Sequence, residues 1–339
     1  MALVLSSDYI TPTELTGYVR TALADLPQNS FGLSAYLPDV MVNDIDFRAS
    51  VGGGGLAKAA KYRSWDAESP ISGRVGVDRI SGSIPPISVK RRLGEFDRLK
   101  MRGISTAIVD AILNDAVDLA KEIHARAEVA RGQAISEGKV TLNENGLVLE
   151  ADFQRKASHT QTAATKWNAG GSKPLDDLLA WQTEYVKTNG VRPGAMLTSQ
   201  DVLSSLMRNS DVRALCLPAG ATQQIVTVDA INAMLMSFGL PPVSLYEAQI
   251  QDDAGAAKAI IDAKKVVFLP GAGQKLGETL WGITAESLDA EYGVDSVDAP
   301  GVVVGSYSDQ DPVALWTKAS AVTLPVPANT NLTLSATVL

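Results

Sequence analysis

The feature of this sequence that most constrains its fold is a long apolar periodicity between residues 104 and 136. Apolar side chains recur there every three or four residues: Ile104, Ile108, Ile112, Ala116, Leu119, Ile123, Ala127 and Ala130. This spacing places them on one face of a helix, and Gly138 suits the position just beyond its end. At 1.5 Å per residue the helix would be roughly 45–50 Å long, well above the globular average. We therefore predict one long helix, the spine helix.

The chain before the spine helix lacks the apolar residues for a core of its own. Residues 1–55 hold short apolar pieces separated by prolines, so we expect an extended N-terminal arm. The arm ends in four consecutive glycines, Gly52, Gly53, Gly54 and Gly55. Such a run gives the backbone great freedom and buries nothing, which indicates a hinge.

Residues 56–102 predict a long two-stranded excursion. Apolar and polar residues alternate at 74–80 and again at 84–90, which favours two strands, and the prolines in the second stretch suit a sheet edge. A solitary hairpin is marginal in water, so we expect a neighbouring chain to cover this one.

After the spine helix the sequence predicts a series of shorter elements. A strand pair over 139–153 turns at Asn145-Gly146, a strong hairpin signal. We expect helices over 174–187, 199–209 and 229–238, and strands over 195–198, 224–228, 243–246, 265–269, 302–307 and 316–325. The remainder is predicted to be a polar, threonine-rich tail.

Charge is distributed unevenly along the chain. The formal net charge is −8, from 38 Asp and Glu against 30 Lys and Arg. Residues 48–131 nevertheless carry 15 basic against 10 acidic residues, whereas residues 245–312 carry 4 against 12. Two oppositely charged regions in one chain favour contacts between copies. The alternative is chance clustering on two solvated faces.

Residues suited to catalysis or metal binding are sparse. Cys216 is the single cysteine and sits among apolar neighbours, which disfavours the reactive thiolate. His124 lies within the spine helix at the flank of its apolar face, and His159 lies in a polar loop. Neither has an acidic residue at metal-ligand spacing. A glycine-rich turn at 271–273 lacks the third glycine of a dinucleotide fingerprint, because Leu276 occupies that place. We therefore expect no enzymatic activity, no metal and no cofactor.

Several short motifs, together with the order of the predicted parts, carry a resemblance. They are the segment Leu149–Arg155, the residue Trp167, the helix start Pro174–Trp181, the segment Asn209–Arg213, the run Asp311–Trp316 and the closing Leu324–Pro327. Over roughly residues 50–327 the chain resembles the major capsid protein E family of tailed phages, of the Hong Kong 97 type fold. Where that family usually has a glycine after its aspartate-phenylalanine pair, this chain has Gln154.

The resemblance implies an α+β fold in five consecutive regions. These are an N-terminal arm (1–55), an extended hairpin or E-loop (56–102), a peripheral domain with the spine helix (103–219), an axial domain (220–312), and a return strand with the C-terminal tail (313–339). It also implies a major capsid protein that self-assembles into the icosahedral shell around the double-stranded DNA genome of a tailed phage, in the host bacterial cytoplasm.

The partners implied are many copies of the chain as hexamers and pentamers, a separate scaffolding protein, a portal and a possible decoration protein. Packaged DNA would be held without sequence-specific contact, since the net charge is acidic, and no membrane is involved. Two alternatives stay open: another virion subunit of the tail or decoration type, and, less favoured, an α/β enzyme with a ligand site within 220–310.

For the contacts between copies we expect the basic excursion of one subunit to lie on an acidic surface of another. The candidate cations are Lys58, Lys61, Arg63, Arg74, Arg79, Lys90, Arg91 and Arg92. The acids opposite them would lie within 247–311 or flank the spine helix, such as Asp110, Asp115 and Asp118. The alternative is docking through the apolar residues Ile80, Ile84 and Ile87.

Overall fold

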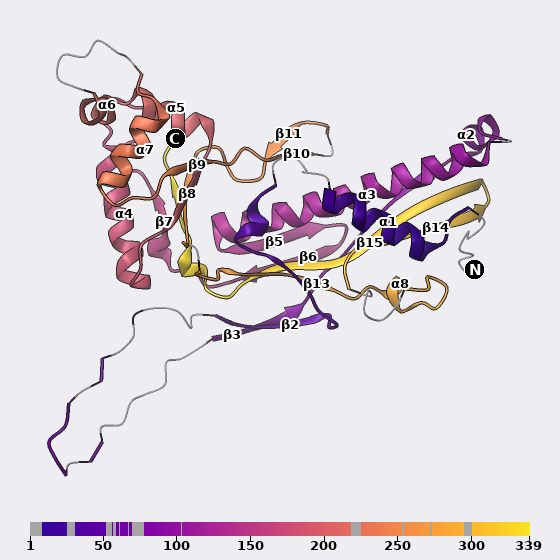
Figure 1. The fold of residues 1–339 in the computed structure, drawn as a ribbon, viewed down its shortest axis with the longest axis horizontal. Helices are drawn as coiled ribbons and strands as arrows, with labels where there is room; N and C mark the ends of the chain where they lie inside the picture. The colour runs from indigo at the N-terminus through magenta and orange to yellow at the C-terminus, as the bar shows by residue number, and fades with distance from the viewer. Residues whose placement is uncertain are drawn as a thin grey trace. The chain divides into compact units, whose positions relative to one another are not determined.

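Figure 1 shows the fold in a computed structural model, which describes residues 9–25, 31–51, 56, 59–60, 62–66, 68–69, 78–102, 104–217, 225–252, 254–271, 273–294 and 300–339. The helices are α1 (Pro12–Asp25), α2 (Glu95–Lys100), α3 (Ser105–Glu137), α4 (Pro174–Asn189), α5 (Gln200–Arg208), α6 (Ser210–Cys216), α7 (Val228–Ser237) and α8 (Ala285–Leu288). Among these described helices none is long and apolar enough to cross a bilayer.

The strands include both long and very short elements. They are β1 (Asp39–Met41), β2 (Asp46–Val51), β3 (Asp78–Ser83), β4 (Pro86–Leu93), β5 (Lys139–Glu144), β6 (Leu147–Asp152), β7 (Thr160–Thr162), β8 (Ala195–Thr198), β9 (Val243–Leu245), β10 (Gln249–Gln251), β11 (Ala257–Ala259), β12 (Lys265–Leu269), β13 (Gly277–Gly282), β14 (Val303–Gln310), β15 (Val313–Pro327) and β16 (Leu334–Thr337).

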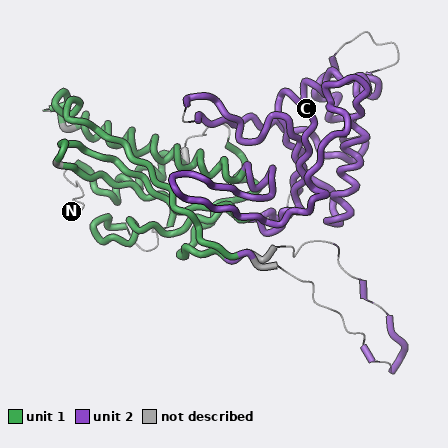
Figure 2. The backbone as a smooth tube through the Cα atoms, turned by 180° about the vertical axis from the view of Figure 1, so that it is seen from behind, with its two compact units in different colours: residues 1–47, 81–131, 278–326 green, residues 48–80, 132–277, 327–339 purple. Residues whose placement is uncertain are grey.

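The chain divides into two compact units, each built from segments that are distant in sequence (Figure 2). Unit 1 comprises residues 1–47, 81–131 and 278–326, and unit 2 comprises residues 48–80, 132–277 and 327–339. The sheet of unit 1 contains β1 from near the start of the chain and β15 from near its end, and the five-stranded sheet of unit 2 contains β16. The peripheral and axial assignments stay predictions.

The predicted spine helix is confirmed as α3. It ends at Glu137 and is followed by Gly138, which has a left-handed φ of 75° and whose N–H donates to the Ala134 carbonyl at 3.1 Å. Inside the helix, the backbone at Gly132 lies close to Ile260. A Cβ at this position would lie 2.5 Å from Cγ2 of Ile260.

Unit 1 is built on a sheet of order β1-β13-β15-β14, with β4 also paired to β15. Fully buried side chains of α3, such as Ile112 and Ile123, pack in one cluster with Trp281 of β13 and Leu315 of β15. Burying each such isoleucine stabilises the fold by about 1.5–3 kcal/mol. The predicted apolar face of the spine helix therefore contributes to the core of this unit from Ile108 to Ala127. Ile104 was wrongly included in that face, because it precedes α3 and is exposed.

Residues 12–25 form helix α1 rather than part of an extended arm. Leu15 and Val19, one turn apart, are fully buried in the core of unit 1. Between them the Thr16 hydroxyl donates to the carbonyl of Val304 at 3.1 Å. The prediction was wrong because two apolar residues are a weak periodic signal, and burial against distant strands rather than local propensity holds this helix.

The predicted hairpin between 74–80 and 84–90 is also wrong. β3 pairs with β2, and β4 pairs with β15 in the sheet of unit 1, where Lys90 lies opposite Lys318. Strand β4 joins this sheet because its alternate residues Ile87 and Val89 pack against the core of unit 1. The excursion is consequently the segment between β2 and β3. The predicted glycine hinge lies outside the described residues.

Unit 2 contains a sheet of order β7-β16-β12-β8-β9, in which β16 is an internal strand. The end of the chain is therefore not the polar tail that the sequence predicted. Leu334, Ala336 and Val338 are buried in the core, and Ser335 and Thr337 between them complete the period-two alternation of a strand.

Most other predicted elements are confirmed. The β5–β6 hairpin turns through Asn145 and Gly146 at φ of 49° and 83°, as an Asn-Gly turn requires. Ser199 caps α5 by accepting from the Val202 N–H. The strand predicted over 224–228 is wrong in its described part, because Thr227 caps α7 at Val228.

Candidate assembly surfaces and a buried polar network

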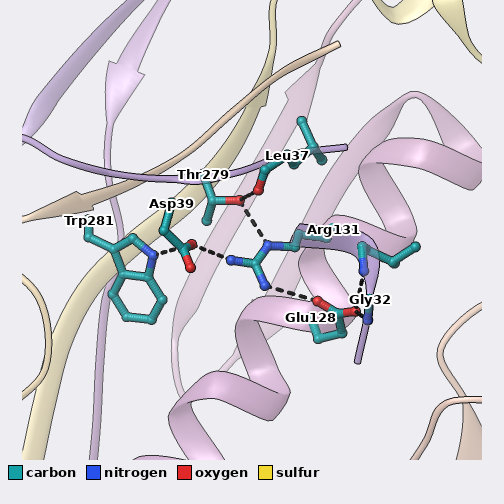
Figure 3. A network of polar contacts seen from close by, with 8 residues as sticks. Gly32, Leu37, Asp39, Glu128, Arg131, Thr279 and Trp281 are labelled. Carbon is teal, nitrogen blue, oxygen red and sulfur yellow. Dashed lines mark hydrogen bonds and ion pairs between the residues drawn. The ribbon is translucent and has the colours of Figure 1, made fainter. Parts of the chain in front are cut away.

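A buried polar network ties the spine helix to the N-terminal part of unit 1 (Figure 3). Glu128 of α3 is fully buried and accepts hydrogen bonds from the N–H groups of Gly32 and Leu33, at 3.0 and 2.9 Å. Arg131, one turn later, donates to Glu128 Oε2 at 2.9 Å and to the Thr279 hydroxyl at 2.9 Å. A buried carboxylate is thus satisfied by one guanidinium and two backbone amides.

Asp39 of β1 extends the same network to the partly exposed edge of the unit. Its Oδ1 accepts from the Arg131 guanidinium and from the Trp281 indole N–H, the latter at 2.6 Å. The His124 ring packs against Trp281 with 5.0 Å between ring centroids. Burial lowers the pKa of His124, although the charge of Asp39 opposes that shift.

Arg91 of β4 binds three carboxylates on one face of the spine helix. Its guanidinium lies 3.1 Å from Asp115, 3.2 Å from Asp118 and 3.1 Å from Glu122. Burial raises the pKa of Asp118, but hydrogen bonds from Lys121 and Arg91 outweigh it, so the pKa lies below its usual value. These partners belong to the same chain, whereas the sequence predicted that Arg91 would meet acids of another copy.

Three of the other candidate interface cations, Lys90, Arg92 and Arg63, have described side chains. Lys90 is exposed, with its Nζ 4.4 Å from the Trp316 ring and 3.4 Å from the Tyr307 hydroxyl. Arg92 is exposed, and Arg63 donates to the carbonyl of its own neighbour Ser64. The predicted residues Lys58, Lys61 and Arg74 and the side chain of Arg79 lie outside the described residues.

The three isoleucines proposed as an alternative docking surface are covered to different degrees by their own chain. Ile84 is buried, and Ile87 packs against the core of unit 1. Ile80 is half-buried. Ile84 is therefore a core residue, because its side chain leaves no surface for a neighbouring copy.

Two aromatic residues that sequence reasoning missed stand on the excursion. Tyr62 and Trp65 are among the most exposed apolar residues of the described chain, Trp65 at 97%. The available signal was two large aromatics within a polar, glycine-flanked stretch, where no core can form around them.

The motif around Arg155 serves to close the C-terminal end of the spine helix. The Arg155 guanidinium donates to the carbonyls of Ile135 and Ser136 at 2.9 and 2.8 Å, satisfying groups that a helix end leaves unpaired. Burial lowers the pKa of Arg155 to about 10, which keeps it charged at neutral pH. Gln154 adopts a left-handed φ of 54°, the conformation that a glycine enters without strain.

The motifs around Trp167 and Asn209 hold the core of unit 2. The Trp167 indole N–H donates to Asp177 at 2.9 Å, and its ring stacks on Trp181. Asn209 caps α6 by accepting from two backbone amides, and its amide group donates to Ser172 at 2.8 Å. These residues therefore position elements of the fold.

The described side chains offer little for catalysis. Burial raises the pKa of the half-buried Cys216 thiol, so the thiol stays protonated at neutral pH. His159 is buried, not in a polar loop, because the turn before β7 places its Nδ1 2.9 Å from the Thr333 carbonyl. A cavity of about 550 Å³ in unit 2 has Asp201 and Arg208 as its charged side chains and no histidine or cysteine in its lining.

Comparisons with known proteins agree with this architecture. A family model described as "Phage major capsid protein E" matches residues 45–338. The structure of a prophage capsid protein from E. coli CFT073 superposes with a TM-score of 0.65 and 15% identity, covering 97% of this chain and 99% of that one. The structure of a phage-related protein from Bordetella bronchiseptica RB50 superposes with a TM-score of 0.56 and 12% sequence identity. It covers 99% of this chain and 98% of that one. No curated protein matches the chain.

The family model covers well over half of the chain, and the structural likeness at these identities concerns the fold. Both agree with the predicted α+β fold of the Hong Kong 97 type, which is confirmed. The chain therefore belongs to the phage major capsid protein E family and is a shell-forming capsid protein of the virion.

Proposed function

We propose that this chain assembles through hexamers and pentamers into the icosahedral shell that encloses the double-stranded DNA genome of a tailed phage. The observation that carries the proposal is the exposed pair Tyr62 and Trp65 on the excursion between β2 and β3. Large aromatic side chains are rarely left uncovered in a protein that stays monomeric, and they are frequent anchors of protein interfaces.

The excursion acts by contacting a neighbouring copy. Its two aromatics supply apolar area at the contact, and the exposed Arg63 beside them carries positive charge. The predicted cations Lys58, Lys61 and Arg74 of the excursion, together with Arg79 of β3, would add to an electrostatic attraction toward acidic residues within 247–311. Each exposed ion pair is worth only about 0–1 kcal/mol, so the aromatics dominate affinity and the charges set the salt dependence.

The remaining partners follow from the proposed role. A separate scaffolding protein, a portal and a possible decoration protein would complete the particle in the host bacterial cytoplasm. The acidic net charge of −8 supports a genome held without sequence-specific contact. The protonated Cys216 and the two buried or half-buried histidines support a role without enzymatic activity.

The test replaces both aromatics, as Tyr62→Ser with Trp65→Ser, and measures shell formation by sedimentation and electron microscopy. A matched control is Val148→Ser, which removes an exposed apolar side chain from β6 of the same unit. We expect the double variant to keep its far-ultraviolet circular dichroism and lose most of its shells, and the control to assemble normally. An unchanged shell yield in the double variant would contradict the proposal that the excursion contacts a neighbouring copy.

A further inference from the structure

Helix α2 is a short helix that the described part of the chain leaves largely exposed. None of its six residues is buried, and two large apolar residues three positions apart, Phe96 and Leu99, are 68% and 63% exposed. Residues at this spacing are neighbours on one helical face. The face therefore offers a compact apolar surface, which we call the α2 surface.

The residues on either side of α2 explain how this surface is held in place. Leu93 before it and Met101 after it pack against the core of unit 1. The Glu95 carboxylate accepts a hydrogen bond from the Val313 N–H at 3.2 Å. A helix of this length is not stable alone in water. The contacts of Leu93 and Met101 therefore hold α2 in place while Phe96 and Leu99 stay exposed.

The rim of the α2 surface is basic. Lys100 lies with its Nζ 4.3 Å above the Phe96 ring. Across residues 92–102 four basic residues stand against two acidic ones. A partner that fits this surface combines an apolar centre with acidic residues around it.

Another part of unit 1 has that complementary character. Helix α8 ends at Leu288, which is 71% exposed, and the acidic residues Asp289 and Glu291 that follow are exposed as well. A capping box between Thr284 and the buried Ser287 fixes the start of this short helix. The α8 surface is thus one outward-facing leucine bordered by two carboxylates.

We propose that the α2 surface of one copy packs on the α8 surface of a second copy. The proposal rests on the proposed function, since it takes a second copy of this chain as the partner. Phe96 and Leu99 cover Leu288, while Lys100 and its basic neighbours meet the two carboxylates. The two surfaces differ, so the contact is heterologous, the type from which rings and closed shells are built.

Cross-linking between two variants tests the contact directly. Leu99→Cys and Leu288→Cys are each made in a Cys216→Ser background, which removes the single native cysteine. The two proteins are assembled together, oxidised, and separated on a non-reducing gel. We expect covalent dimers in the mixture at about tenfold the level of either variant alone, the ratio that a preference of 1.4 kcal/mol gives. The matched control mixes Val148→Cys with Leu288→Cys and stays at the single-variant level.

Charge reversal provides a second, independent readout. Lys100→Glu with Arg102→Glu puts carboxylates against carboxylates, which we expect to lower shell yield at least about tenfold. The same holds for Asp289→Lys with Glu291→Lys, whereas combining all four changes in one chain restores shells.

The outcomes separate this inference from the proposed function. If the wild-type chain forms shells but the mixture gives no mixed dimers, the α2–α8 contact alone is wrong. Dimers of Leu99→Cys with itself would also overturn it, because they would mean that two α2 surfaces meet. Failure of the four-change chain to recover would also overturn it. A wild-type chain that never forms shells contradicts the proposed function instead.

Discussion

Arg131 and Arg91 provide a direct test of how burial sets the value of an ion pair. Arg91 makes three ion pairs with a side chain that is 40% exposed, whereas the Arg131 side chain is 5% exposed and pairs with a Glu128 that is fully buried. Counting bridges would rank Arg91 as the more important residue. We expect the opposite ranking. Water and salt screen the exposed charges around Arg91, whereas the loss of Arg131 leaves a buried carboxylate without its cation.

The perturbation is Arg131→Met, which keeps much of the side-chain length and removes the charge. It takes away the guanidinium that lies 2.9 Å from Glu128 Oε2, whereas the amides of Gly32 and Leu33 still donate to Oε1. Removing one partner of a buried pair costs about 3–5 kcal/mol. Arg91→Met removes exposed pairs that contribute about 0–1 kcal/mol each.

The assay is equilibrium urea unfolding of the full chain, followed by tryptophan fluorescence. We expect a loss of about 3–5 kcal/mol in the free energy of unfolding for Arg131→Met. Adding Glu128→Gln should recover part of that loss, because the buried negative charge that lost its cation is then removed. The Arg91→Met loss should shrink further as salt is added. Losses of equal size for Arg91→Met and Arg131→Met, or no recovery in the double variant, would refute the argument from burial.

Three further predictions concern single positions. Burial lowers the pKa of both His124 and His159 in the folded chain. Below the ordinary pKa of histidine, the unfolded chain therefore binds more protons than the folded chain. Urea unfolding should accordingly show stability falling as pH drops below about 6.5, and a flat profile would contradict this. Gln154→Gly should raise the free energy of unfolding by about 1 kcal/mol by relieving a left-handed φ; a loss would show that the side chain contributes more than the strain costs. Gly132→Ala should lower the melting temperature despite the higher helix propensity of alanine, because the added methyl meets Ile260; an increase would mean that this neighbour yields freely.

Local signals in the sequence were enough for much of the fold. The spine helix was predictable because its apolar face repeats over many turns, and Gly138 and Ser199 mark helix ends through their own backbone chemistry. The Asn145-Gly146 turn fixed a hairpin register for the same reason. Each of these signals acts within a few residues of the element it specifies.

Elements that depend on distant partners could not be predicted in this way. Glu128 and Arg131 look like a surface pair on a helix, and their burial comes from Leu33 and Thr279, which are far away in sequence. The helix at 12–25 and the last strand are likewise held by remote strands.

The candidate assembly surface was predicted only in outline. A basic stretch was expected to meet acidic residues, yet the sequence could not show that Asp115 is the partner of Arg91 within its own chain. Nor does it show that Ile84 is buried while Trp65 is uncovered. The charge of Arg91 is evident from the sequence, but its position beside the spine helix depends on the packing of β4, which pairs with the distant strand β15.

Electron cryomicroscopy of the chain expressed with its phage's other head proteins tests the central claim most directly. The account predicts closed shells with fivefold and sixfold clusters of this chain, in which density covers Tyr62 and Trp65 from a neighbouring copy. Tubes, small rings or a monodisperse monomer, or shells in which both aromatics stay open to solvent, would contradict it.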